Sequence, residues 1–150
     1  MKAIVYYFEK SFNGRIVAEE VARRFEGELF PIEAEEEHSH SGFFGWFKRI
    51  FSVRLNRSTN TSFANYNPLF FCVSGDYKVI TGFFNSLNLA NKDIILFGTS
   101  NDDKKIISSL KASIKDKKGV LRQTFIVKSN GLNEEAIRQL AKVILKELKI

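Results

Sequence analysis

The polar stretch after the first apolar run holds the groups best suited to binding a ligand. It reads Glu9-Lys-Ser-Phe-Asn-Gly14 and leads, with Arg15, into a helical pattern. Asn13 and Gly14 are residue types that tolerate unusual backbone angles, which predicts a tight loop. Such a loop directs backbone N–H groups and the positive end of the helix toward one point, where anions bind readily. A plain strand–helix connection that binds nothing is the alternative.

No set of side chains predicts catalysis by the protein alone. The two histidines, His38 and His40, lie in one polar stretch, and the single cysteine, Cys72, sits inside an apolar run where a thiolate is disfavoured. No GxGxxG motif follows a strand, which argues against a dinucleotide-binding domain, and signatures of phosphoryl transfer are absent. Any redox chemistry would therefore need a cofactor.

The elements that must hold this loop alternate along the chain. Residues 2–8 are apolar and rich in β-branched and aromatic types, which predicts a buried strand, and the spacing of Val17, Val21 and Phe25 predicts a helix. Further strands are expected at 28–33, 68–73, 93–98 and 120–127, and further helices at 77–89, 106–114 and 133–148. Pro31 favours an edge position for the second strand. Strands alternating with helices predict an α/β fold with a parallel sheet covered on both faces.

Length and composition limit the class of protein. A chain of 150 residues is about one domain, and a single cysteine cannot form an internal disulfide, which suits a reducing compartment. The sequence shows no signal peptide and no apolar stretch of the ~20 residues that a membrane span needs, so we expect a cytoplasmic protein. The net charge of +6 favours an anionic partner such as a nucleotide, an acidic protein or a lipid surface. A basic domain without such a partner is the alternative.

An aromatic and basic insertion at about 38–62 interrupts the alternation. It follows an acidic cluster of Glu33, Glu35, Glu36 and Glu37. Its apolar side chains have helical spacing: Phe43, Trp46, Phe47, Ile50 and Phe51. Two interpretations are open, namely a helix packed over the sheet edge or ligand crevice, and a helix that docks on a membrane surface or a partner. The close spacing of His38 and His40 is a weak metal pattern, so we expect a solvated loop there.

Three stretches resemble flavodoxins. Residues 2–22 resemble the family's opening strand, phosphate loop and helix. Residues 65–77 resemble the strand and loop that flank the flavin ring, and residues 86–100 resemble the stretch before the third ligand loop. The resemblance implies a three-layer, doubly wound, five-stranded parallel sheet in the order 2-1-3-4-5. It also implies FMN at the carboxyl ends of strands 1, 3 and 4. The switch point between strands 1 and 3 coincides with the anion site predicted from the residues.

The first ligand loop departs from the family pattern. Ser11 and Asn13 match it, but Glu9 puts a carboxylate where a hydroxyl would face the phosphate, and Phe12 replaces a glycine. Lys10 and Arg15 offset the added negative charge, and the loop amides remain donors. Phosphate binding is therefore expected to be weakened and not abolished.

The candidate cofactor-binding residues come from all three loops. They are Lys10, Ser11, Phe12, Asn13, Gly14 and Arg15 in the first, Ser74, Gly75, Asp76 and Tyr77 in the second, and Thr99 and Ser100 in the third. Tyr77 either stacks on the flavin or simply begins a helix, and residues 101–103 suit a helix cap as well as a ligand loop.

The working hypothesis is an FMN-binding electron-transfer protein or small flavin reductase with a redox partner protein and no nucleic-acid partner. The alternative is a cofactor-free protein of the same fold that binds a protein or a membrane surface through the insertion.

Overall fold

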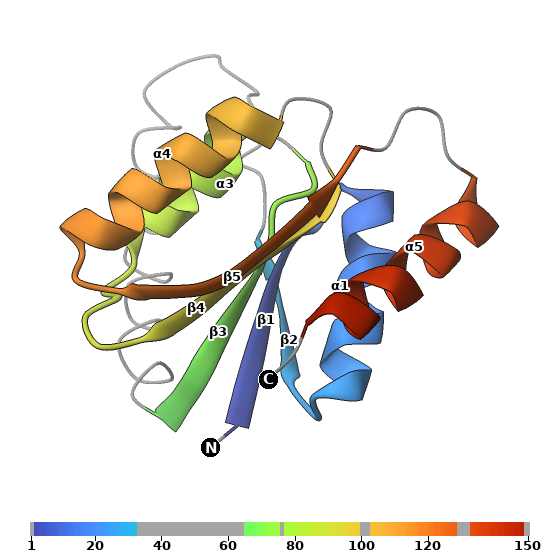
Figure 1. The fold of residues 1–150 in the computed structure, drawn as a ribbon, viewed down its shortest axis with the longest axis horizontal. Helices are drawn as coiled ribbons and strands as arrows, with labels where there is room; N and C mark the ends of the chain where they lie inside the picture. The colour runs from blue at the N-terminus through green and yellow to red at the C-terminus, as the bar shows by residue number, and fades with distance from the viewer. Residues whose placement is uncertain (1, 33–64, 76, 100–102, 129–132, 149–150) are drawn as a thin grey trace, which may run out of the picture.

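The part of the chain that the structure describes forms one five-stranded parallel sheet in the order β2-β1-β3-β4-β5 (Figure 1). The computed structural model describes residues 2–32, 65–75, 77–99, 103–128 and 133–148. The strands are β1 (Lys2–Phe8), β2 (Glu28–Ile32), β3 (Tyr66–Cys72), β4 (Asp93–Thr99) and β5 (Val120–Val127). Each neighbouring pair is parallel. This confirms the predicted doubly wound α/β fold, including the edge position of β2 with its Pro31.

Helices cover both faces of the sheet. They are α1 (Phe12–Arg24), α3 (Tyr77–Ser86), α4 (Asp103–Asp116) and α5 (Glu134–Glu147). Helices α1 and α5 lie on one face, and α3 and α4 lie on the other (Figure 1). Successive side chains of a strand point to opposite faces, so Phe70 packs in the α1–α5 layer while Phe71 packs in the α3–α4 layer. The central strands are buried on both sides, which explains their almost continuous apolar sequences.

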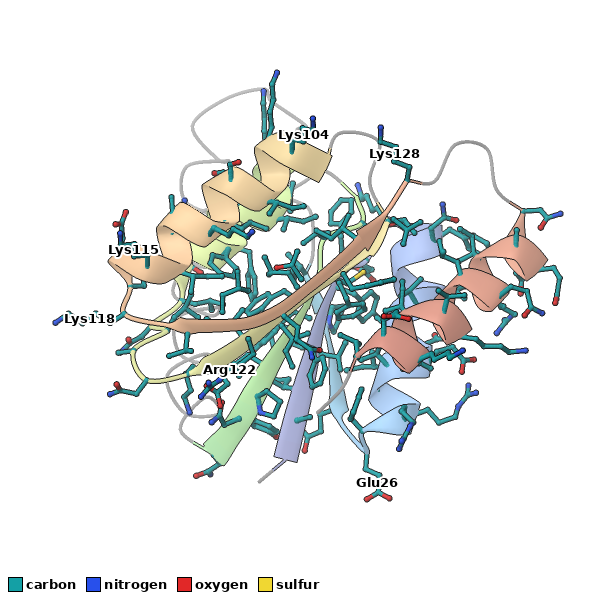
Figure 2. The ribbon with its side chains drawn as sticks, in the orientation of Figure 1. Glu26, Lys104, Lys115, Lys118, Arg122 and Lys128 are labelled. Carbon is teal, nitrogen blue, oxygen red and sulfur yellow. The ribbon has the colours of Figure 1, made fainter. Side chains whose placement is uncertain are left out.

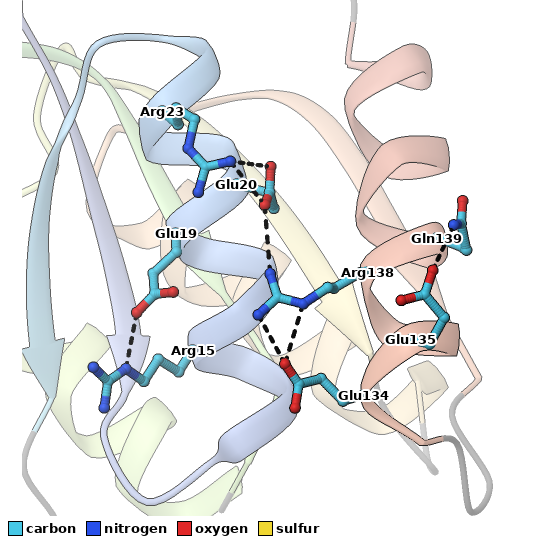
Figure 3. Close-up of polar contacts among 8 residues, drawn as sticks. All are labelled: Arg15, Glu19, Glu20, Arg23, Glu134, Glu135, Arg138 and Gln139. Carbon is cyan, nitrogen blue, oxygen red and sulfur yellow. Dashed lines mark hydrogen bonds and ion pairs between the residues drawn. The ribbon is translucent and has the colours of Figure 1, made fainter.

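Helices α1 and α5 lie side by side and share one apolar cluster. Val17 and Val21 of α1 pack there with Ile137 and Ile144 of α5, all fully buried. At the surface, Arg138 of α5 lies 3.8 Å from Glu20 of α1 (Figure 3). Exposed ion pairs of this kind contribute little, so the apolar contacts hold the two helices together.

Helix α5 begins at the predicted cap, whereas helix α3 ends earlier than predicted. Asn133 caps α5, as predicted, and its side chain accepts a hydrogen bond of 2.9 Å from the Ala136 N–H. Helix α3 ends at Ser86, three residues before the predicted end at Leu89. The Lys117 ammonium donates to the carbonyl oxygen of Leu87 at 2.7 Å, so a side chain from beyond α4 satisfies a carbonyl at this helix end.

Several predictions concern residues that the structure does not describe. The acidic cluster, His38, His40 and the aromatic insertion at 38–62 all fall there, so the insertion's helix and its two interpretations stay predictions. Within the described ranges, no helix is both long and apolar enough to cross a membrane. In the same ranges, no group of three or more His, Cys, Asp or Glu side chains is arranged to hold a metal ion.

Candidate functional site

The carboxyl ends of β1 and β3 bring the start of α1 against the segment that follows β3. The contact depends on Gly14: a Cβ built there would lie 2.9 Å from Ser11 Oγ and 3.1 Å from Ser74 Cβ. No real side chain fits at such distances without displacing its neighbours. This is the topological switch point of the sheet, where the order of the strands reverses.

Helix α1 begins earlier than the sequence suggested. Strand β1 ends at Phe8, and Ser11 is already the N-cap of α1, with its Oγ accepting a hydrogen bond of 3.0 Å from the Gly14 N–H. Residues 12–14 are therefore helical, and the predicted loop of unusual backbone angles is wrong. Gly14 is needed for close approach to Ser74. A serine N-cap offers an early acceptor for the orphan amides of the first turn, which favours this early start.

The first turn of α1 keeps two amides available to a ligand. The Ser11 N–H donates to the Phe8 carbonyl at 3.0 Å, and the Arg15 N–H donates to the Ser11 carbonyl at 2.9 Å. The amides of Phe12 and Asn13 lie in the first turn, where an α-helix offers no acceptor. They are directed outward with the positive end of the helix dipole. The predicted cradle for an anion is thus a helix N-terminus with the Ser11 hydroxyl beside it.

The described side chains around this helix end leave it open. The Phe12 ring is 61% exposed, and the Glu9 side chain is also exposed, so neither is buried inside the turn. Arg15 is exposed, and its Nε donates to Glu19 at 2.9 Å, one turn further along the helix (Figure 3). That hydrogen bond raises the pKa of Arg15, which stays cationic. Lys10 is exposed in the turn between β1 and α1.

Two predicted ligand residues of the other loops face each other inside the protein. Ser74 and Thr99 are 2% and 3% exposed, and their hydroxyl oxygens lie 2.9 Å apart. The Thr99 N–H also donates to Ser74 Oγ at 2.7 Å. These bonds tie the end of β4 to the segment after β3. The two hydroxyl groups are therefore engaged with each other, whereas the sequence suggested that they line a ligand site.

The segment after β3 continues over Phe8. Gly75 is exposed and has a φ of +129°, and a Cβ there would come within 2.4 Å of Phe8 Cδ1. Only glycine combines this backbone angle with so close an approach. Tyr77 is the first residue of α3, which agrees with the second of its two interpretations. Asp76 and Ser100 lie outside the described residues, as does the Tyr77 side chain.

Cys72 lies beneath the site, a position that sequence reasoning did not assign to it. Its thiol is buried and donates to the Gly14 carbonyl, with a sulfur–oxygen distance of 3.6 Å. Burial raises the pKa of this thiol, so the neutral form is favoured, as the apolar sequence around it predicted. The sequence offered one indication of this position: Cys72 lies two residues before Ser74, and alternate residues of an extended chain share a face.

The fold and this switch-point site define the chain as a doubly wound α/β protein. No protein-family model and no curated protein matches its sequence. Solved structures do match along nearly its whole length, and they include flavodoxins and other flavoproteins. The chain therefore has the flavodoxin-like fold.

Three solved structures illustrate the match. A candidate flavoprotein from Bacteroides uniformis has a TM-score of 0.54 at 20% identity, covering 94% of this chain and 97% of that one. General stress protein 14 from Treponema denticola, solved in complex with FMN, has a TM-score of 0.54 at 7% identity, covering 97% of each chain. Oxidised flavodoxin 2 from Bacillus cereus has a TM-score of 0.53 at 13% identity, covering 99% of this chain and 100% of that one. Identities this low establish the fold alone.

Proposed function

We propose that this protein binds FMN at the carboxyl edge of its sheet and serves as an electron-transfer protein or small flavin reductase for a redox partner protein. One observation carries the proposal: α1 begins at the switch point with the amides of Phe12 and Asn13 and the Ser11 hydroxyl at its open end. The structural neighbour solved with FMN supports the choice of ligand. A cytoplasmic location is part of the same proposal.

The residues present suit the phosphate of FMN. A phosphate group needs several donors and a positive potential, and a helix N-terminus offers both. Lys10 and Arg15 are exposed beside it and add positive charge. Glu9 opposes binding, but its side chain is exposed, so water screens the repulsion and the carboxylate can turn away from the ligand.

The flavin ring would lie toward the segment after β3. Gly75 is exposed there and presents its backbone without a side chain. The Ser74–Thr99 hydrogen bonds hold that backbone in place from below. Bound FMN would supply the redox chemistry, while the protein would position it and keep the phosphate paired.

Comparing FMN with riboflavin tests the proposal, because the two differ only in the phosphate. We expect FMN to bind more tightly, as measured by the quenching of flavin fluorescence during titration. Glu9→Ser should strengthen FMN binding several-fold and leave riboflavin binding unchanged, because it removes like-charge repulsion from the phosphate alone. Glu147→Ser, at the exposed end of α5, is the matched control and should change neither. A protein that ignores both flavins, with and without Glu9→Ser, would refute the assignment.

A second candidate is a protein of this fold without a cofactor. The engaged hydroxyls of Ser74 and Thr99 and the short connection before α1 favour it, because both reduce the donors that face a ligand. Such a protein would use the insertion at 38–62 for a protein partner or a membrane surface. A double variant, Glu9→Ser with Phe12→Gly, distinguishes the two: a gain of FMN affinity supports a weakened flavin site, and no gain supports the cofactor-free protein.

A further inference from the structure

The positive charge of this protein is concentrated in one continuous segment. Residues 103–128 contain eight Lys or Arg side chains and two Asp side chains, a net charge of +6 that equals the net charge of the whole chain. This segment consists of α4, a short turn and β5. The remaining residues are neutral in sum. In the described part of the chain, positive charge is therefore concentrated on α4 and β5.

Most of these cations lie exposed at the surface. Six lysines of the segment are exposed and define what we call the basic face: Lys104, Lys105, Lys111, Lys115, Lys118 and Lys128. Among the described residues, no acidic side chain pairs with any of them. The other two cations are engaged, since Lys117 donates to the Leu87 carbonyl and Arg122 pairs with Asp93 at 2.8 Å. The six exposed lysines thus differ from Lys117 and Arg122, whose side chains make contacts within the fold.

The arrangement of the basic face is elongated. Lys104, Lys111 and Lys115 recur at intervals that place them along one side of α4, and eleven residues of helix span ~16 Å. Lys118 extends the row beyond the end of α4, and Lys104 and Lys128 both lie toward the carboxyl edge of the sheet (Figure 2). Unpaired like charges in a row repel one another. A negatively charged partner bound along the row would reduce this repulsion.

The composition of the face favours a protein over other anionic partners. Its six cations are all lysines, and the exposed arginine of the same segment, Arg122, is paired with Asp93, whereas bidentate recognition of phosphate groups favours arginine. Among the described residues, the exposed large apolar side chains are Phe12, Leu29, Val120 and Val143, none of which lies on α4. The described side chains of α4 thus present no aromatic ring to stack on a base and no large exposed apolar group to insert into a bilayer.

We propose that the basic face is a docking surface for an acidic protein, bound through long-range electrostatics along α4. The surface needs no flavin, so the inference goes beyond the proposed function and survives if FMN does not bind. A contact of this kind forms quickly, is weak and depends steeply on salt, because exposed charges are screened by ions.

A fluorescein-labelled peptide of repeated Glu-Ala-Ala-Glu-Ala-Ala-Ala units is the probe, and its anisotropy reports binding to the full chain. We expect binding at about 20 mM NaCl that weakens on the order of tenfold at about 200 mM. The variant K111E/K115E should bind about tenfold more weakly than the parent at low salt.

The control variant is K142E/K146E. It changes two exposed lysines four residues apart at the end of α5, on the opposite face of the sheet, and lowers the net charge by the same four units. If the peptide binds the basic face, the affinity of this variant for the peptide should lie within about twofold of the parent's affinity. Equal losses in the two variants would overturn the proposal, because net charge alone would then explain binding.

Two further probes test the choice of partner. Vesicles with about 30% phosphatidylserine and a short DNA duplex are compared at the same salt concentrations. Weaker binding of both than of the peptide supports a protein partner. Tighter binding of either one, lost in K111E/K115E, would assign the face to a membrane or to nucleic acid instead, and no salt-dependent binding of any probe would refute a docking role.

Discussion

Replacing Ser74 by alanine perturbs the hydrogen bonds that join β4 to the segment after β3. The change removes the acceptor of the Thr99 N–H, at 2.7 Å, and the partner of the Thr99 hydroxyl, at 2.9 Å, and both residues are buried. A buried donor left without an acceptor costs about 1–3 kcal/mol, and a lost neutral hydrogen bond about 1 kcal/mol. We therefore expect Ser74→Ala to lower the free energy of unfolding by about 2–4 kcal/mol.

A double-mutant cycle separates the two hydrogen bonds. Thr99→Val keeps the N–H donor and removes only the hydroxyl group, so it should cost about 1 kcal/mol. Each single variant loses the hydrogen bond between the two hydroxyl groups, and the double variant, Ser74→Ala with Thr99→Val, loses the same bond only once. The destabilisation of the double variant should therefore be smaller than the sum of the two single destabilisations by about 1 kcal/mol. Urea unfolding followed by far-ultraviolet circular dichroism measures all four proteins, and an unchanged m-value shows that the transitions are comparable.

The cycle has a clear refuting result. If Ser74→Ala costs no more than Thr99→Val, the Thr99 N–H does not depend on Ser74 Oγ, and our account of the joint between β3 and β4 is wrong. Additive single effects would likewise show that the two hydroxyl groups do not bond to each other in solution.

Two further predictions concern Gly75 and Tyr6. Gly75→Ala should cost about 2–4 kcal/mol, because it combines a φ of +129° with a contact on Phe8, while Gly82→Ala in the open part of α3 should stabilise by about 0.5–1 kcal/mol in the same urea assay. Burial raises the pKa of Tyr6 far above its ordinary value, so the unfolded chain releases this proton near pH ~10 while the folded chain keeps it. Stability should fall as the pH rises above that point, and the fall should be shallower in Tyr6→Phe. Equal slopes for the two proteins would contradict the burial of an un-ionised Tyr6.

The sequence by itself determined the elements and their class, because local patterns encode them. Apolar runs and helical repeats predicted the strands and helices, Pro31 predicted an edge strand, and Asn133 predicted the start of α5. These signals depend on propensity and periodicity over a few neighbouring residues. The strand order followed from a resemblance of residues 2–22 and two later stretches to flavodoxins, which the observed sheet bears out.

The tertiary structure decided how separate segments meet. The pairing of Ser74 with Thr99 joins residues 25 apart, and the requirement for glycine at position 14 arises in part from Ser74, which follows β3. The early start of α1 was also missed, since a Ser-Phe-Asn-Gly sequence suits a turn as well as a capped helix. The sequence shows that residues 103–128 are basic, but the packing of α4 against the sheet, of which β5 is the edge strand, decides which lysines are exposed. Contacts of this kind depend on strand order and register, which no short window of sequence contains.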